Sequence, residues 1–407
     1  MEFRFAPPEE AFRREIREFL RLELPADWAS GSATGGLGEG GEERWEFLRE
    51  FQRKLAAKGW LTLGWPQEHG GMGATHMTQV IYSEEMAYHR APTQLGVGPD
   101  RVGPTIILYG SEEQKAKLLP GIVNANDVCC QGFSEPGSGS DLASLQTRAD
   151  ADGDYFVVNG QKIWTSFAHK ADWCILLART DQEAPKHKGI SYFLLDMRTP
   201  GIEIRPLVDM MNRHTFNQIF FENVRIPRDC LVGELNRGWY VAAATLDFER
   251  SGINRVVGGY RTYEDLVEYA ALKPASGGNG PSTGLRTGQR LLDEPGVKQK
   301  LAELAIEFHV GRMLAYRVAS MQARGQIPNA EASMSKLYGS ELQQRLAGAG
   351  MNILGLAGQL EPDTNGAPLS GRIEQFYLFA SALTVAAGTS EIQRGIIAGR
   401  GLGLPRG

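Results

Sequence analysis

The stretch "CQGFSEPGSGSDLASLQTRA" at residues 130–149 contains residue types that suit a phosphate-bearing ligand. Gly137 and Gly139 permit the backbone to approach a ligand closely, and backbone N–H groups of such a loop can bind phosphate oxygens. Hydroxyl groups are supplied by Ser134, Ser138 and Ser140. The alternative is a Gly/Ser turn capped by Asp141, and the loop taken alone favours that plainer interpretation.

Two further stretches also suit a ligand, one through a flat aromatic side chain and one through free backbone N–H groups. In "NGQKIWTS", residues 159–166, Trp164 can cover a flat ring while the Ser166 hydroxyl bonds its edge, although a tryptophan is more often part of a core. In "LTVAAGTSEIQR", residues 383–394, a Gly-Thr turn opens a short helix. Its first N–H groups are free for a ligand, and the alternative is a plain N-cap at Thr389.

Hydrophobic spacing predicts the elements that position these stretches. The pattern of the first third predicts helices. One apolar face covers residues 9–22, and a second covers the region from Trp45 to Leu55. Ser111 and Gln114 form a capping box that predicts the start of a further helix. The face of residues 9–22 consists of Phe12, Ile16, Phe19 and Leu20. The Gly/Ser-rich residues 30–41 predict an exposed linker.

From about residue 128 the pattern changes to short β-branched and aromatic runs, which predict strands with a hairpin at Asn159-Gly160. Helical periodicity returns at residue 238, and the expected helices are 238–272, 297–324, 330–354 and 371–386. We therefore expect three domains: helical residues 1–127, β residues 128–237 and helical residues 238–407.

Composition limits the classes of protein. The net charge of −5 argues against nucleic acid as a partner, and no apolar run reaches membrane-span length, so a cytoplasmic location is expected. None of the four cysteines lies in a CxxC pair, and no His/Cys group has metal-ligand spacing. We expect no disulfide, no metal site and no membrane partner.

The order "SEPGSGSD", "GQKIWTS" and "GTSEIQR" across a helical, β and helical chain resembles the acyl-CoA dehydrogenase family of flavoproteins. The resemblance covers essentially the whole chain. It implies an α+β multidomain fold with an N-terminal helical domain, a central antiparallel β-barrel-like domain and a C-terminal four-helix bundle, with FAD between the last two. The residues that match the family's FAD contacts in these motifs are Phe133, Ser134, Gly139, Ser140, Trp164, Ser166, Thr389 and Glu391.

The resemblance also implies the reaction. A carboxylate removes a proton from Cα of an acyl-CoA thioester, a hydride leaves Cβ for the flavin, and the product is the trans-2-enoyl-CoA. Many members place the carboxylate immediately before Gly-Thr, where this chain has Ala387, whose backbone N–H can still bond the thioester oxygen. Other members use a helix with an "LxxER" pattern, and "TLDFERSGINR" places Glu249 and Arg250 there. Glu249 is therefore the expected base.

Two departures bear on assembly. The family's "RxxFG" segment, which reaches FAD of a neighbouring subunit, is replaced by "RTGQRLLDEPGVKQK", with Arg286 and Arg290 as candidates. The turn that usually helps to hold the adenine half reads "MNILGLAGQL" and keeps only Asn352 and Gly355. Both resemble bacterial members that act on steroid side chains and pair two unlike chains. Homotetramer and heterotetramer both stay open.

Electron-transfer flavoprotein is the expected electron acceptor. An acyl-CoA oxidase-like flavoprotein and an FAD-poor partner subunit of a heteromeric dehydrogenase are the alternatives.

Overall fold

The computed structural model describes residues 5–26, 28, 41–93, 95–250, 253–272, 290–362 and 364–405. The chain divides into two compact units built from separate stretches of sequence. The bundle unit comprises Met1–Gly36, Thr75–Ala91 and Arg250–Gly407, and the sheet unit comprises Leu37–Ala74 and Pro92–Glu249. Each unit has its own hydrophobic cores. Of the expected linker 30–41, only Gly41 is described, and it begins a helix.

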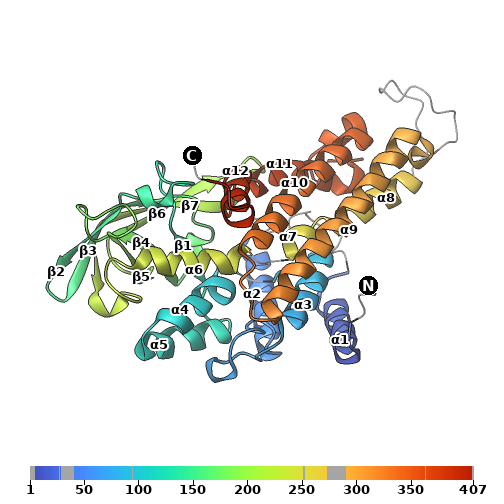
Figure 1. Ribbon diagram of the computed structural model, residues 1–407. Coiled ribbons are helices and arrows are strands. Elements are labelled where there is room, and N and C mark those ends of the chain that lie inside the picture. The colour runs from blue at the N-terminus through green and yellow to red at the C-terminus, as the bar shows by residue number, and fades with distance from the viewer. Residues whose placement is uncertain are drawn as a thin grey trace. The chain divides into compact units, whose positions relative to one another are not determined.

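The sheet unit contains one seven-stranded sheet with helices around it (Figure 1). Its strands are β1 (Cys129–Gly132), β2 (Arg148–Asp152), β3 (Tyr155–Lys162), β4 (Trp173–Arg179), β5 (Ile190–Asp196), β6 (Ile202–Val208) and β7 (His214–Pro227). Its α-helices are α2 (Gly41–Ala57), α4 (Gly103–Tyr109), α5 (Glu112–Val123) and α6 (Gly238–Arg250). Ser111 and Gln114 form the expected capping box before α5.

The strand order is β1-β4-β2-β3-β7-β6, and β5 pairs with the other edge of β4. The β2–β3, β3–β7, β6–β7 and β4–β5 pairs are antiparallel, whereas β1 and β2 run parallel to β4. The sheet is therefore mixed, and the expectation of a purely antiparallel domain was wrong in this respect. The Gly/Ser-rich loop lies between β1 and β2, and the stretch that contains Trp164 lies between β3 and β4.

Strand β4 shows why the sheet can separate two cores. Every residue of β4 is buried, because alternate side chains enter opposite faces. Trp173, Ile175 and Leu177 join the core that contains residues of α4, α5 and α6. Cys174, Leu176 and Ala178 join the core between β3, β5 and β7.

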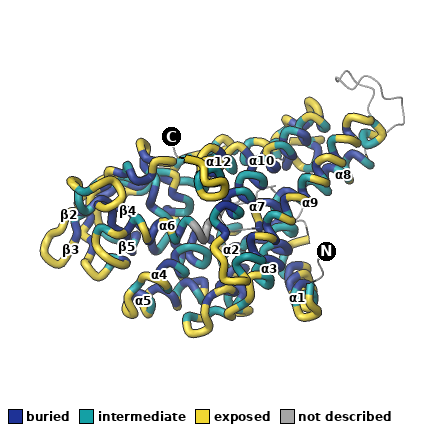
Figure 2. Tube along the Cα trace, in the orientation of Figure 1, coloured by how far each residue is buried: buried dark blue, intermediate teal, exposed yellow. Residues whose placement is uncertain are grey.

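The hairpin expected at Asn159-Gly160 was wrong, because both residues lie inside β3. The pairing with β7 has a bulge between Val158 and Gly160, and a Cβ on Gly160 would lie 2.6 Å from Thr147 Oγ1. Glycine is needed there for this close approach rather than for a turn. The chain turns instead at Gly153, with φ of 57°, between β2 and β3, where Figure 2 shows an exposed tip.

The bundle unit is helical among its described residues. Its α-helices are α1 (Pro7–Glu23), α3 (His76–Tyr88), α7 (Asn254–Val257), α8 (Tyr260–Leu272), α9 (Pro295–Ala323), α10 (Asn329–Leu354), α11 (Arg372–Leu383) and α12 (Ser390–Ile396). Helices α9 and α10 pack side by side (Figure 1). The apolar face expected over residues 9–22 is confirmed, since Ile16, Phe19 and Leu20 are buried in α1.

The single helix expected over residues 238–272 is instead α6, α7 and α8. Gly258 and Gly259 separate α7 from α8. A Cβ on Gly259 would lie 2.2 Å from Gln343 Oε1 of α10, so the break allows the backbone to approach that helix.

The expected α+β class is confirmed, with helical N-terminal segments, a central curled sheet and a helical C-terminal region. The domain boundaries at residues 127 and 237 stay predictions. Among the described residues, no helix is long and apolar enough to cross a membrane. The cytoplasmic location also stays a prediction.

Candidate functional site

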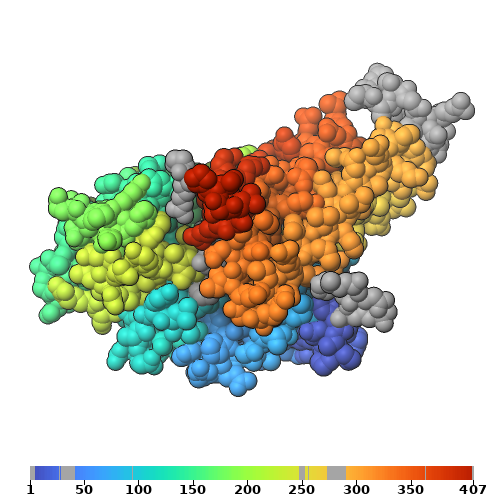
Figure 3. Space-filling view, viewed as in Figure 1, coloured from blue at the N-terminus to red at the C-terminus, as the bar shows by residue number. Residues whose placement is uncertain are grey.

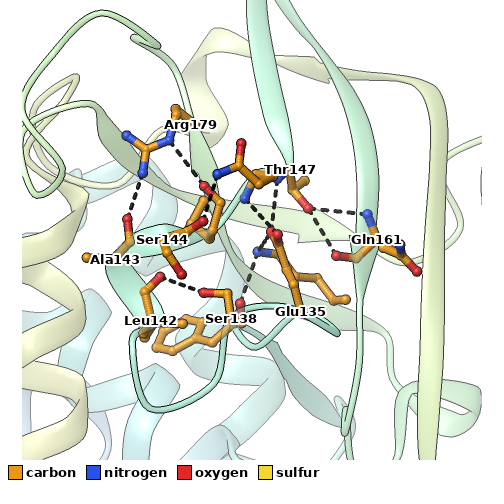
Figure 4. A network of polar contacts seen from close by, with 12 residues as sticks. Glu135, Ser138, Leu142, Ala143, Ser144, Thr147, Gln161 and Arg179 are labelled. Atoms are coloured by element: carbon orange, nitrogen blue, oxygen red, sulfur yellow. Dashed lines mark hydrogen bonds and ion pairs between the residues drawn. The ribbon is translucent and has the colours of Figure 1, made fainter.

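The loop after β1 is held by a buried carboxylate (Figure 4). The Glu135 oxygens accept hydrogen bonds from the backbone N–H groups of Gln146 (2.6 Å) and Thr147 (2.9 Å). Lys162 Nζ lies 2.7 Å from Glu135 Oε1 and donates to the Phe133 carbonyl at 3.0 Å. Lys162 is 0% exposed and Glu135 is 7% exposed. This ion pair therefore fixes both ends of the loop to the end of β3.

Opposing effects set the pKa of each partner in this pair. Burial alone would raise the pKa of the Glu135 carboxyl, but the Lys162 charge and the hydrogen bonds to the carboxylate hold it below its usual value. Burial lowers the pKa of Lys162 more than the Glu135 charge raises it.

The tip of the loop has no packing role that explains its glycines. A Cβ built on Gly137 or Gly139 would meet nothing within 4 Å. Gly139 and Ser140 are exposed, and Ser134 is half-buried. By contrast, Ser138 is buried and its hydroxyl donates to the carbonyls of Asp141 and Leu142, so it shapes the loop rather than facing a ligand (Figure 4).

Trp164 is an exposed indole on a strained backbone. It is 61% exposed and has φ of 60°, a conformation that costs energy for a residue with a bulky side chain. Thr165 next to it is 0% exposed and exchanges two backbone hydrogen bonds of 3.0 Å with Asn217 of β7. The Ile163 N–H bonds the Ser134 carbonyl at 2.9 Å. The fold thus brings the loop at Phe133 and Ser134 beside the stretch that contains Trp164 and Ser166.

Phe133 itself is only 3% exposed and packs edge-on against Tyr192 at 5.9 Å. Its side chain belongs to the core of the sheet unit. Only its backbone carbonyl, which is bonded to Lys162, lies in the polar network.

In the bundle unit the Gly-Thr turn is held from three sides. Ala387 has φ of 55° and Gly388 has φ of 86°. The Ala387 carbonyl accepts from Gln393 Nε2 at 3.0 Å, and the Gly388 carbonyl accepts from buried Lys336 at 2.7 Å. Thr389 caps α12 by accepting from the Ile392 N–H at 3.2 Å. Within the described residues, no acceptor is found for the Ala387 N–H.

An open pocket of about 530 Å³ lies beside this turn. It is lined by Glu341, Gln344, Arg345, Thr384, Val385, Thr389, Ser390, Glu391 and Arg394. The Ser390 Oγ is buried and has no hydrogen-bond partner among the described residues. The C-terminal segment with α12 lies on the face shown in Figure 3 (red).

The remaining candidates have different environments. Asn352 is exposed near the end of α10, and Gly355 follows that helix with φ of 60°. Neither lines the pocket beside the turn. Arg290 forms an exposed ion pair with Asp293 at 2.8 Å. Arg286 lies outside the described residues.

Glu249 and Arg250 are the last two residues of α6, and their side chains lie outside the described part of the chain. The preceding turn of α6 is anchored in the core of the sheet unit. Buried Thr245 lies 2.8 Å from the Thr105 hydroxyl and 3.4 Å from the Tyr192 hydroxyl. Position 249 follows Thr245 by one helical turn.

Sequence reasoning missed the residues that support the site: Glu135, Lys162, Asn217, Lys336 and Gln393. The available signal was Lys162, which occupies a buried position of strand β3. A buried charged side chain requires a partner. Among the described residues, no group of three or more His, Cys, Asp or Glu side chains is placed to hold a metal ion.

Models of the three acyl-CoA dehydrogenase domains match this chain: the N-terminal domain at residues 7–126, the middle domain at 130–224 and the C-terminal domain at 236–402. Acyl-CoA dehydrogenase IpdE1 of Mycobacterium tuberculosis is 37% identical over 98% of this chain and 98% of its own length. The chain belongs to the acyl-CoA dehydrogenase family. It is thus an oxidoreductase of a family that acts on CH–CH groups with FAD.

Two solved structures are similar to this chain along its whole length. The Tcur3481-Tcur3483 steroid ACAD has a TM-score of 0.88 and 35% identity and covers 100% of both chains. The ChsE4-ChsE5 complex from Mycobacterium tuberculosis has a TM-score of 0.86 and 34% identity, also over 100% of both chains. The acyl-CoA dehydrogenase family predicted from the three motifs is therefore confirmed.

The residues present fit FAD in both units. In the sheet unit, Trp164 offers an exposed aromatic face on a strained backbone, and Gly137 and Gly139 lie in open space. In the bundle unit, the cap at Thr389 borders a pocket that contains a buried hydroxyl without a partner. Each of these features suits a flat ring or a phosphate-bearing ligand.

Proposed function

We propose that this protein catalyses α,β-dehydrogenation of an acyl-CoA thioester to the trans-2-enoyl-CoA and passes the electrons to an electron-transfer flavoprotein. The observation that carries the proposal is the Ala387 N–H. The resemblance assigns this N–H to the family's oxyanion position; it lies on a turn held by Lys336 and Gln393 and has no acceptor among the described residues. A donor held in place in this way stabilises charge that develops on a thioester oxygen.

Glu249 is the proposed base, because Ala387 has no carboxylate and the resemblance matches Glu249, in α6, to the family's alternative base position. Its carboxylate removes the Cα proton, and we propose that adjacent Arg250 helps to keep the carboxylate ionised. Bound FAD would supply the acceptor for the hydride that leaves Cβ. The proposed FAD-binding residues are Phe133 (through its backbone), Ser134, Gly139, Ser140, Trp164, Ser166, Asn352, Gly355, Thr389 and Glu391.

We propose a bulky, ring-bearing acyl chain as the substrate class. The absence of a carboxylate at Ala387 leaves side-chain volume beside the thioester that a straight-chain enzyme would fill. Support comes from the steroid ACAD that covers the whole chain at 35% identity. Assay of a panel of straight, branched and ring-bearing acyl-CoA esters with an artificial electron acceptor tests this proposal. A preference for short straight chains would refute it.

Replacement of Trp164 by alanine should weaken FAD binding by about 5–150-fold, because a stacked aromatic side chain contributes roughly 1–3 kcal/mol. Trp164→Phe keeps an aromatic face and should retain most of the affinity. Flavin content per chain after dialysis, measured with the dissociation constant of re-added FAD, provides the comparison. Equal FAD affinity in the alanine variant and the parent would remove Trp164 from the site.

The protein should assemble into an oligomer. Two related structures are named for pairs of different proteins, and Arg290 is engaged by Asp293 rather than presented in an "RxxFG" segment. Light scattering, combined with the ratio of flavin to protein chains, distinguishes a homotetramer from an assembly of two unlike chains. A homotetramer with one FAD per chain excludes the two-chain assembly, and a low ratio in the chain expressed alone supports it. A monomer with full flavin contradicts both.

A further inference from the structure

Two histidines of the sheet unit are linked through Asn217 to the segment that contains Trp164. His169, in the short helix after Phe167, stacks on His214 at the start of β7, with ring centroids 4.0 Å apart and an interplanar angle of 23°. His169 is exposed and His214 is partly buried. Neither residue takes part in the proposed reaction.

Both imidazoles bond one buried amide. Asn217 is 0% exposed, and its Oδ1 accepts from His214 Nε2 at 2.8 Å. Asn217 Nδ2 lies 3.1 Å from His169 Nδ1, and Asn217 Oδ1 lies 3.2 Å from the same ring nitrogen. His169 Nδ1 therefore accepts from the amide nitrogen when it is unprotonated and donates to the amide oxygen when it is protonated, while His214 Nε2 donates to that oxygen.

The same amide holds the backbone beside Trp164. Asn217 Nδ2 donates to the Thr165 carbonyl at 3.0 Å, and the backbones of the two residues exchange two further bonds. Trp164 precedes Thr165 directly, and Phe167 follows it by two residues. Both aromatic residues have φ of 60°. A strained segment of this kind persists only where its surroundings fix it.

We propose that Asn217, His169 and His214 are positioning residues that hold Trp164 and Ser166 for the flavin, and that protonation of His169 weakens FAD binding. The inference rests on the proposed function, because it assigns a pH response to the same FAD site. The two imidazoles act through Asn217 and the Thr165 backbone.

The charges around the pair do not favour two protonated rings. Among the described residues, neither imidazole bonds a carboxylate. The surrounding charged groups are Lys170, which bonds Glu42; Arg205, which bonds Glu203; Asp209, which accepts from the backbone of Met211 and Arg213; and buried Arg213. Partial desolvation of the ring lowers the pKa of His169, the nearby His214 and Lys170 lower it further, and the hydrogen bond to Asn217 Oδ1 opposes this shift by raising it.

The sign of the pH dependence follows. A histidine with a lowered pKa favours the conformation in which it is neutral, so the ordered segment is fully stabilised above the ordinary pKa of about 6.5. As the pH falls below that value, a conformation that lets His169 protonate gains population. A protonated His169 Nδ1 no longer accepts from Asn217 Nδ2 and competes with His214 Nε2 for Asn217 Oδ1 as a second donor.

The test is the dissociation constant of FAD for the full-length protein, measured by flavin fluorescence from about pH 8 to about pH 5.5. The test variant is His169→Gln combined with His214→Gln, because glutamine keeps a hydrogen-bonding amide that does not titrate. The matched control is His69→Gln, which removes a histidine of the same unit that lies outside the cluster. Circular dichroism at each pH shows that every variant is folded.

The parent and His69→Gln should lose about fivefold in FAD affinity across this range, and the double variant should keep its affinity throughout. If the double variant does not fold, the parent's profile decides, because a flat profile overturns the inference. A pH step that survives in a folded double variant also overturns it. Failure of the parent to bind FAD at any pH would instead refute the proposed function.

Discussion

Glu249→Gln should slow flavin reduction by an acyl-CoA substrate by about 10²–10⁴-fold, while FAD stays bound. Glutamine keeps the shape of glutamate and cannot accept the Cα proton. The measurement is single-turnover reduction in a stopped-flow instrument, expressed per bound flavin. Glu268→Gln removes an exposed carboxylate of α8 and should leave the rate unchanged.

A second variant relocates the carboxylate. Glu249→Ala combined with Ala387→Glu should recover part of the rate, more for straight-chain than for ring-bearing substrates. The backbone at 387 already has φ of 55° with an alanine, so the added strain is small. Reduction at the parental rate in Glu249→Gln would show that another residue is the base.

Lys162→Met should destabilise the protein by about 3–5 kcal/mol, because it leaves the Glu135 carboxylate buried without its cation. The loop from Phe133 to Thr147 would lose its anchor, and FAD retention should fall with it. Thermal unfolding and flavin content measure the two effects. The double change Lys162→Met with Glu135→Gln removes both charges and should cost less than Lys162→Met alone.

The loop also offers a matched control. Lys186 forms an ion pair with Asp141 of the same loop, but both side chains are largely exposed. Lys186→Met should therefore cost less than about 1 kcal/mol. Equal losses in Lys162→Met and Lys186→Met would contradict the assigned role of burial.

The Lys162→Met penalty should shrink at acidic pH. In the parent the pKa of Glu135 is held below its usual value, so its stabilising contribution is present at neutral pH and is lost as the pH falls through that lowered pKa. Without Lys162, burial raises the pKa of Glu135, and the carboxyl becomes neutral at a higher pH than in the parent. Denaturant titrations at neutral and acidic pH provide this comparison.

Local sequence patterns predicted several elements of the fold. The apolar face of α1, the capping box of α5 and the fully apolar β4 and β5 follow from spacing over a few residues. The parallel pairing of β1 with β4 joins Cys129 to Trp173, which lie far apart in sequence, and no local pattern specifies it. Asn159-Gly160 was misread for the same reason, because the contact that requires glycine comes from Thr147 on another segment.

The site shows the same limit. The sequence identified residues that suit a ligand, such as Trp164, Ser134 and Thr389, because their types and order resemble a family. It did not identify the residues that hold them, because Glu135 meets Lys162, and Lys336 meets Gly388, only after folding. The left-handed backbone of Trp164 and Ala387 is likewise a result of tertiary contacts and is not encoded by either residue type.

The most direct test of the central claim is anaerobic mixing of the FAD-bound protein with a ring-bearing acyl-CoA thioester, followed by mass analysis of the product. The account predicts loss of the oxidised flavin absorbance together with an enoyl-CoA product that has two hydrogens fewer than the substrate. Electron-transfer flavoprotein should then restore the oxidised flavin. A fully FAD-loaded protein whose flavin stays oxidised with straight, branched and ring-bearing thioesters alike would contradict the account.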